Sequence, residues 1–373
     1  MRFIVSSTTL LKSLQAISGV LNSNNTLPIL DDFLFKAEGN DLIITASDLE
    51  TTMSVSVTPE MLEDAGMITI PAKILLDTLK TYHDIPLTFI INEDLSTVEI
   101  SSESGKYKLA GHRGEEYPQT PVLDDPMTLS LKSEVLYSAI TKTIFATGND
   151  ELRPVMSGVF FQLSPEDATF VATDAHKLVR YRRADAASEE SLSFIMPKKP
   201  LNQLKSNLSN DDSDVRIDYN VTNARFSFNN LVMVCRLIEG KYPNYDAVIP
   251  RDNPNVLTIA KAPLIAAIKR VAIYGNQSTH QIRFKMVGQM LTLTAEDVDY
   301  SNEGAEVLTC TYDGDDMEIG FNSKFLHEML NNADTENIMI EMSAPNRAGL
   351  ITQVDPENVN ENMLMLVMPV MLN

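Results

Sequence analysis

The sequence predicts an α+β protein in which one domain occurs three times, with mostly antiparallel sheets. Similar stretches recur at residues 44–79, 170–205 and 293–330, and they begin ITASDLETTMSVSV, FVATDAHKLVRYRR and LTAEDVDYSNEGAEV. In each copy, short segments of alternating polarity form hairpin-like runs around two helical segments. That arrangement is typical of antiparallel α+β domains.

The repeat has the length of a whole domain. Asp48, Asp174 and Asp297 occupy equivalent places, and they lie 126 and 123 residues apart. Solenoid and propeller repeats are much shorter, about 20–50 residues. Acidic segments that contain proline separate the copies at 124–126 and 250–254. We therefore predict domains at 1–126, 127–253 and 254–373.

Each copy is expected to begin with a short strand and a helix. Alternating segments at 3–5, 129–131 and 257–259 predict the strands, and helices are predicted at 8–20, 133–146 and 262–274. The segment Ser6-Ser7-Thr8 and Ser133 supply N-cap residues for the first two helices. Pro263 suits the first turn of the third.

The later elements follow one order in all three copies. Strands are predicted at 41–46 and 53–57, at 158–163 and 169–172, and at 281–286 and 290–294. A second helix follows at about 72–82, 198–208 and 323–331. Further strands close each copy, in the first at 87–91, 97–101 and 106–109.

The composition indicates a soluble globular protein. Of the 373 residues, 44% are hydrophobic and 22% are charged. The chain contains no apolar run of the roughly 20 residues that a membrane helix needs, and its N-terminus lacks the organisation of a signal peptide. We expect a cytoplasmic protein without a membrane partner. Cys235 and Cys310, one each in two copies, are expected to be buried thiols in a reducing compartment.

The charge is unevenly distributed along the chain. The net charge is −21, but the six predicted helices together carry +7, which leaves −28 on the strands and loops. Lysines favour exposed helix faces in any protein, so this split has a purely structural explanation. The functional interpretation is that the helices form one positive surface for a polyanion, while the acidic remainder repels nucleic acid elsewhere. Any DNA contact would then involve the backbone and be independent of sequence.

No motif in the sequence indicates catalysis or a cofactor. Phosphate-binding, dinucleotide-binding, nucleophile-elbow and zinc-helix patterns are absent, and the five histidines lack metal-ligand spacing. Because the repeated aspartates occur once in each domain, we expect them to stabilise turns. The alternative is that they are ligands of a metal-dependent hydrolase. Asp174 and His176 are not expected to form a catalytic pair, since no nucleophile motif accompanies them.

Several segments resemble the β subunit of bacterial DNA polymerase III, the sliding clamp family. They are the opening MRFIVSSTTLLKSLQAISGVL and the segments TLPIL (26–30), VATDAHKL (171–178), KYPNY (241–245), MEIGFN (317–322) and LVMPV (366–370). The resemblance is collinear over the full length. It implies a DNA-clamp fold in which a head-to-tail homodimer of three-domain chains closes a ring around duplex DNA. Antiparallel sheets would lie outside, and two helices per domain would line the hole.

The resemblance also implies a non-catalytic processivity factor for a DNA polymerase, with no cofactor and no metal. Its partners would be duplex DNA, the replicative polymerase, the clamp loader and other replication and repair proteins that carry short clamp-binding peptides. These peptides would enter a hydrophobic cleft between the second and third domains. The matching positions here are Met156, Thr173, Ala175, His176, Lys177, Leu178, Pro243, Val248, Asn322, Phe325, Leu366, Val367, Met368, Pro369, Val370 and Met371.

The same resemblance places the dimer contacts, whereas the charge count on the predicted helices favours their cations for the surface that faces DNA. The dimer contacts would involve Tyr107 and Leu109 on an edge strand, and Ile273 and Tyr274 at a helix end. The residues facing DNA would be Lys12, Lys73, Lys142, Lys198, Lys199, Lys205, Lys269 and Arg270.

The chain departs from the family pattern at three places. Many members carry arginine at Met371, a basic residue in the loop 23–25, and aromatic residues near 153–155. DNA contact through these two loops is therefore not expected. A peptide-binding scaffold that does not encircle DNA is the alternative function.

Overall fold

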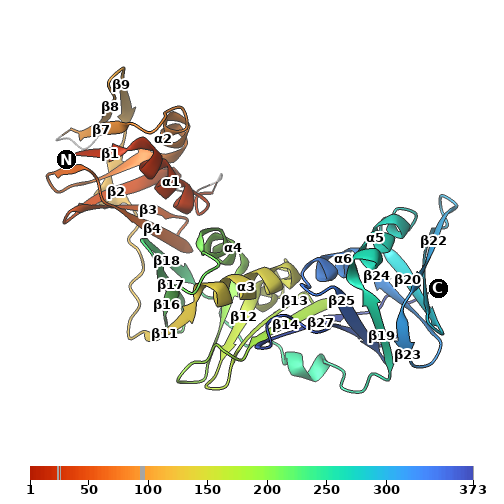
Figure 1. Ribbon diagram of the computed structural model, residues 1–373. Helices are drawn as coiled ribbons and strands as arrows, with labels where there is room; N and C mark the ends of the chain where they lie inside the picture. The colour runs from red at the N-terminus through yellow and green to blue at the C-terminus, as the bar shows by residue number, and fades with distance from the viewer. Residues whose placement is uncertain (23–24, 26, 93–96, 373) are drawn as a thin grey trace. The chain divides into compact units, whose positions relative to one another are not determined.

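The computed structural model describes residues 1–22, 25, 27–92 and 97–372. The chain forms two compact units, one of residues 1–137 with 199–237 and the other of residues 138–198 with 238–373. Figure 1 shows the elements of both in chain order. The middle repeat therefore contributes to both units. All strand pairs within the described part of the chain are antiparallel, which confirms the predicted α+β class.

The first unit contains two sheets. The smaller sheet has the order β5 (Met61–Glu63), β1 (Arg2–Ser6), β7 (Pro86–Ile91), β8 (Thr97–Ser101) and β9 (Lys106–Ala110). The larger has the order β10 (His112–Arg113), β6 (Met67–Pro71), β2 (Asp32–Glu38), β3 (Asp41–Ser47), β4 (Thr51–Val57), β18 (Leu231–Arg236), β17 (Asn223–Phe228), β16 (Asp214–Tyr219) and β11 (Met127–Lys132).

The second unit also contains two sheets. The larger has the order β15 (Leu192–Pro197), β12 (Gly158–Leu163), β13 (Ala168–Thr173), β14 (Lys177–Arg183), β27 (Glu361–Val367), β26 (Gly349–Gln353), β25 (Asn337–Met342), β19 (Asn255–Ala260) and β23 (Thr311–Asp313). The smaller has the order β22 (Asn302–Thr309), β21 (Met290–Asp297), β20 (Gln281–Val287) and β24 (Met317–Asn322).

The helices occur where the sequence predicts them. They are α1 (Ser7–Ser18), α2 (Ala72–Leu79), α3 (Ser133–Thr143), α4 (Lys198–Asn207), α5 (Lys261–Ala272) and α6 (Ser323–Asn331). Ser6 caps α1, because its hydroxyl accepts a hydrogen bond from the Thr9 amide at 3.2 Å. The segment 144–146, predicted as the end of the α3 helix, is a 3-10 turn instead.

Apolar faces of helices and sheets meet in the cores. In the first unit, α1 packs against β1, β3 and β4, and α2 against β2 and β6. The rings of Phe3 and Phe89 stack there with centroids 4.7 Å apart. In the second unit, α5 packs against β20, β21 and β22, and α6 against β24. The predicted burial of Cys235 and Cys310 is confirmed, and both are free thiols.

Each nine-stranded sheet crosses one of the predicted domain joints. In the first unit, β4 of the first repeat pairs with β18 of the second. In the second unit, β14 of the second repeat pairs with β27 of the third. In the smaller sheets, β9 of the first repeat and β22 of the third are edge strands, and they follow β8 and β21 in their sheets. The nine-stranded sheets thus join neighbouring repeats, whereas the smaller sheets each belong to a single repeat.

Candidate partner-binding surface, basic helices and open edges

The repeated aspartates stabilise turns, as predicted. One carboxylate oxygen of Asp48 accepts hydrogen bonds from the amides of Glu50 and Thr51, at 3.1 and 2.7 Å. Asp174 does the same for the amides of His176 and Lys177, at 2.9 and 2.8 Å. Asp297 accepts from the Asp299 amide at 3.2 Å. These bonds are those of Asx turns.

The structure offers no support for metal or Asp–His chemistry at these turns. Within the described ranges, no group of three His, Cys, Asp or Glu side chains is arranged to hold a metal ion. Asp174 uses its other oxygen to bind the Lys177 ammonium at 2.8 Å. The His176 ring instead lies against the Phe325 ring, with centroids 6.1 Å apart.

The end of the chain lies against the turn at Asp174. Strand β27 pairs with β14, so that Leu366 is opposite Leu178. Beyond the strand, the Met368 amide donates to the His176 carbonyl at 2.8 Å, and the Val370 amide donates to the Gly320 carbonyl at 2.8 Å. Two backbone hydrogen bonds therefore hold the tail against Gly320 and against His176, which is one of the positions predicted to bind partner peptides.

Beneath this surface lies a cluster of apolar side chains. Leu178 and Leu366 are buried in it together with Tyr242, and Tyr245 and Ile249 pack against it. The Phe160 and Tyr242 rings stack at 4.7 Å. The cluster gives the surface a packed floor, since close-packed interiors resist deformation.

The predicted cleft residues differ in their exposure. Thr173, Lys177, Leu178, Leu366 and Val367 are buried. Met368, Val248 and Met371 are 42, 58 and 70% exposed, and Ala175 and His176 are also exposed. Met156, Pro243, Asn322, Phe325, Pro369 and Val370 are partly buried. The predicted set thus combines buried residues with exposed apolar side chains, and its methionines are flexible enough to adapt to different ligands.

Lys177 is a buried cation with several partners. Its ammonium binds Asp174 and lies 3.3 Å from a carboxylate oxygen of Glu328. It also lies 4.5 Å from the centroid of the Phe325 ring, a distance at which a ring attracts a cation. Sequence reasoning missed Glu328, because the contact joins α6 to a distant turn and leaves no local pattern. The α6 cap was also missed: the Asn322 side chain accepts from the amides of Lys324 and Phe325.

Five of the eight cations predicted to face DNA are without an ion pair among the described residues. Lys12, Lys73 and Lys269 are exposed, and Lys198 and Lys205 are partly buried. Lys199 instead donates to the Val20 carbonyl and binds Asp48 at 2.5 Å. Arg270 binds both carboxylate oxygens of Glu306, at 2.5 and 2.6 Å, which lowers the pKa of Glu306.

The prediction that Lys142 faces DNA is not supported by its surroundings. Its side chain is only 9% exposed, and its ammonium lies 2.5 Å from Asp334 and 2.8 Å from Glu361. It also lies over the Tyr181 ring, 5.3 Å from the centroid. These carboxylates neutralise the charge, so Lys142 has a structural role.

Replacing Lys142 by methionine is expected to destabilise the protein. The change leaves the poorly exposed Glu361 carboxylate without its main partner, which costs about 2 kcal/mol of the free energy of unfolding. Urea denaturation measures this difference. Lys12→Met is the matched control, since Lys12 has no such partners, and its effect should stay within about 0.5 kcal/mol. Equal stability of both variants would contradict the structural role.

The residues predicted for the dimer contact lie on β9 and at the end of α5, which packs against β22. Tyr107 on β9 is 47% exposed, and its ring contacts Tyr82 edge-on, with centroids 6.3 Å apart. Tyr107 also lines a hollow of about 590 Å³, which Ile74 and Thr78 of α2 line on the other side. In the second unit, Ile273 and Tyr274 follow α5 and are 71 and 48% exposed. Leu109 on β9 is partly buried. Both β9 and the end of α5 thus expose apolar groups.

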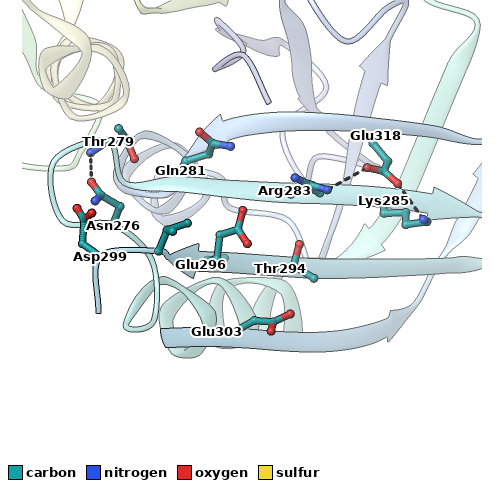
Figure 2. Close-up of a pocket in the computed structure, with 12 residues that line it drawn as sticks. Asn276, Thr279, Gln281, Arg283, Lys285, Thr294, Glu296, Asp299, Glu303 and Glu318 are labelled. Atoms are coloured by element: carbon teal, nitrogen blue, oxygen red, sulfur yellow. Dashed lines mark hydrogen bonds and ion pairs between the residues drawn. The ribbon is translucent and has the colours of Figure 1, made fainter. Parts of the chain in front are cut away.

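A second hollow, of about 460 Å³, lies on the open face of the small sheet in the second unit. Figure 2 shows the polar side chains that line it, with Arg283 and Lys285 of β20 directed toward Glu318 of β24. These ion pairs measure 3.4 and 2.8 Å, and the hydrogen bond from Lys285 lowers the pKa of Glu318. Glu303 of β22 lines the same hollow. Because both cations are paired, the hollow has an acidic balance.

The two loops that depart from the family pattern differ in what the structure describes. In the loop 23–25, Ser23 and Asn24 lie outside the described residues. Arg153, near the other loop, forms an ion pair with Asp150 at 2.8 Å.

Among the described residues, no helix is long and apolar enough to span a membrane.

The chain is similar to known proteins over its full length. It is 28% identical to a beta sliding clamp of Vibrio cholerae over 372 residues and 27% identical to one of Pseudomonas aeruginosa over 374 residues, with all of each chain covered. The fold matches the crystal structure of a sliding clamp from Pseudomonas aeruginosa bound to griselimycin, with a TM-score of 0.94, 27% identity and full coverage of both chains. It also matches a DNA polymerase III beta subunit from Thermotoga maritima, with a TM-score of 0.91, 23% identity and full coverage of both chains, which shows the fold alone.

The family matches divide the chain into three parts. Residues 1–121, 130–244 and 246–370 match the N-terminal, central and C-terminal domains of the DNA polymerase III beta subunit. Together these matches cover nearly the whole chain in the family's own order. The protein therefore belongs to the DNA polymerase III beta subunit family, the sliding clamps, which are non-catalytic accessory subunits of a DNA polymerase.

Proposed function

We propose that the protein is a processivity factor that works as a head-to-tail homodimer closed around duplex DNA. The observation that carries this proposal is the incomplete set of sheets. Two sheets of nine strands each join neighbouring repeats, whereas the outer repeats carry open sheets of five and four strands. Pairing β9 of one copy with β22 of another would form a further nine-stranded sheet. Because this contact joins different surfaces of identical chains, it gives a ring when it closes.

The hollow beside β9 supports the same contact. Ile273 and Tyr274 come immediately after the last residue of α5, and Gly19 and Val20 come immediately after the last residue of α1. The two pairs therefore occupy equivalent positions in the third and first repeats. Within the first unit, Gly19 lies against α4, and a side chain there would collide with Gln203. The equivalent helix in the first repeat is α2, and it lines an open hollow instead. Ile273 and Tyr274 of a second copy would fill that hollow and bury apolar area.

The unpaired cations on the helices support a contact with DNA. Lys12, Lys73, Lys198, Lys205 and Lys269 would attract phosphates without reading bases. The carboxylates on the sheets and loops would repel DNA from the remaining surface. Such a ring holds DNA by enclosing it and slides freely, because each contact is with the regular backbone.

The decisive experiment compares DNA topologies. A clamp loaded onto nicked circular DNA should stay bound during gel filtration and should be lost once the DNA is cut to a linear form. A ring dissociates from linear DNA by sliding off the end, so this loss is the signature of enclosure. Equal retention on both forms would rule out encirclement and would favour direct binding. A complete lack of DNA retention would favour the peptide-binding scaffold.

The helix lysines should determine how strongly DNA association depends on salt. We expect the triple variant Lys12→Ala, Lys205→Ala and Lys269→Ala to have a shallower slope of log affinity against log salt concentration. The magnitude of the slope should fall by about 0.9 for each phosphate that the variant no longer neutralises. Fluorescence anisotropy with duplex DNA measures this slope. The control replaces three strand lysines, Lys36, Lys132 and Lys285, which bind Glu38, Asp214 and Glu318. Equal slopes for the two triple variants would refute the assignment.

The surface around β14 and the tail is proposed as the site for partner peptides. It combines a packed apolar floor with exposed methionine and valine side chains, which suits one groove that accepts several peptides. The partners would be the replicative polymerase, the clamp loader and other proteins that carry short clamp-binding segments. The clamp would thus tether enzymes to DNA in the cytoplasm without contributing chemistry.

A further inference from the structure

We propose that ring closure pairs β22 with β9 of a second copy in one register, with Gly304 opposite Tyr107 and Glu303 opposite Lys108. This inference rests on the proposed homodimer and adds which residues meet. The register follows from the two joints that the chain forms within itself.

Strands β9, β18 and β27, one in each repeat, can be aligned with one another by following the strand pairing from the first strand of each repeat. Residues 3, 129 and 257 each lie four positions before the first helix of their repeat. Each of these residues is opposite a residue on the neighbouring strand, and the pairing can be followed in this way over four adjacent strands. The resulting rows are Phe3–Phe89–Ile100–Tyr107, Leu129–Ile217–Phe226–Met233 and Leu257–Ile340–Ile351–Met365. Tyr107, Met233 and Met365 are therefore equivalent.

The strand that receives these residues follows the repeated turn. Residues 46, 172 and 295 are alanines, two positions before the repeated aspartates. They pair with Met53, Val179 and Gly304 across the turn. The third turn is two residues longer, so Gly304 lies seven positions after its aspartate, whereas Met53 and Val179 lie five positions after theirs. Gly304 is therefore the equivalent of Met53 and Val179.

The pairing at the two joints within the chain then predicts the pairing at the joint between two copies. Met233 is opposite Met53 in the first unit, and Met365 is opposite Val179 in the second. By the same rule, Tyr107 of a second copy is opposite Gly304. The adjacent pair is Lys108 with Glu303, since antiparallel strands run in opposite directions.

The side chains agree with this register. Tyr107 is opposite the buried Ile100 and therefore lies on the helix side of its sheet. Gly304 is also on the helix side, because a side chain at that position would touch the Tyr274 ring. A shift by one residue would place Tyr107 opposite Glu303, on the wrong face. In the proposed register, the rings of Tyr274 and of Tyr107 from the second copy cover Gly304, which has no side chain. Aromatic residues cover glycines in sheets in the same way.

The charges agree as well. Lys108 and Glu303 lie on the opposite face, and neither forms an ion pair in the described part of its own chain. Glu99 is the cross-strand neighbour of Lys108, and its pKa is lowered mainly by the hydrogen bond from Lys106 and also by the charge of Lys108. Figure 2 shows Glu303 on β22, the outermost strand of that sheet, and Glu296 is its cross-strand neighbour on β21. Lys108 would therefore approach two carboxylates. Lys106, in contrast, already binds Glu99 at 3.1 Å. In the proposed register, Lys106 of the second copy is opposite Ala305 of the first.

Zero-length cross-linking tests the register directly. A carbodiimide joins a lysine amine to a carboxylate only when the two are in contact. We expect the dimer to yield a peptide pair that links Lys108 to Glu303. Mixing ¹⁵N-labelled and unlabelled protein before the reaction shows whether the link joins two chains. A link from Lys106 to Glu303 would overturn the register, since it requires a shift by two residues.

Charge reversal tests whether the pair contributes to recognition. Lys108→Glu and Glu303→Lys should each weaken the dimer by about tenfold, because they place like charges opposite each other, and combining them should restore most of the affinity. The control is Lys106→Glu, which Glu303→Lys should not rescue. Sedimentation velocity measures each dissociation constant. A monomeric wild type would refute the proposed dimer itself, whereas a dimer without rescue would refute only the pairing of Lys108 with Glu303.

Discussion

Replacing Ile273 and Tyr274 by aspartate is expected to convert the dimer into monomers. The wild-type protein should sediment with twice the mass of the 41.4 kDa chain. Both side chains are exposed in the single chain, so the change should not unfold it. Each would place a charge in the hollow between α2 and β9 of the second copy. The change removes the apolar contacts of both side chains and desolvates two carboxylates in a hollow that Lys73 and Asp77 also line, so the dissociation constant should rise by a factor on the order of 100 or more.

The same variant should lose retention on circular DNA, since a monomer cannot enclose it. Val221→Asp with Val359→Asp is the matched control. These valines are 88 and 89% exposed, and they lie between β16 and β17 and between β26 and β27, outside the residues predicted for the dimer contact. The control should remain dimeric. If the variant at 273 and 274 kept the mass of a dimer at micromolar concentration, the proposed interface would be wrong.

Deleting residues 368–373 is expected to weaken partner binding and leave the dimer intact. The deletion keeps β27, which ends at Val367, and removes the two backbone hydrogen bonds that hold Met368 and Val370. It also removes the exposed apolar side chains of Met368 and Met371. Without these two side chains, binding should be weaker by about 2 kcal/mol, which corresponds to an affinity roughly thirtyfold lower.

Isothermal titration with a peptide from the polymerase measures this affinity, and sedimentation confirms the mass. The single change Met371→Ser should give a smaller loss, of about a few fold, because one methionine contributes less apolar area than the whole tail. Met290→Ser is the control, since Met290 is an exposed methionine on β21, outside the predicted cleft residues. Unchanged affinity after the deletion would remove the tail from the partner-binding site.

Local sequence patterns were sufficient to predict most elements of the fold. The six helices lie within a few residues of their predicted positions, because apolar periodicity and capping residues act over one or two turns. The turn role of Asp48 and Asp174 was also predictable, since an aspartate binds amides two and three positions ahead. The predicted domain boundaries at 126 and 253 remain a prediction.

The candidate sites were predictable only in part. Residue type alone placed Lys142 with the cations that would face DNA, whereas the structure buries it between Asp334 and Glu361. Those carboxylates come from positions about 190 and 220 residues further along the chain, so no local pattern could show them. The contact of Lys177 with Glu328 was missed for the same reason.

The sequence by itself determined three repeats of one α+β domain, basic helices on an acidic chain and the family to which the protein belongs. These properties depend on composition and short-range order, which one chain displays directly. Only the tertiary structure decided which strands join the repeats, which lysines remain unpaired and which edges stay open. The physical reason is that strand pairing, burial and ion pairing depend on residues far apart in sequence, and folding alone brings them together.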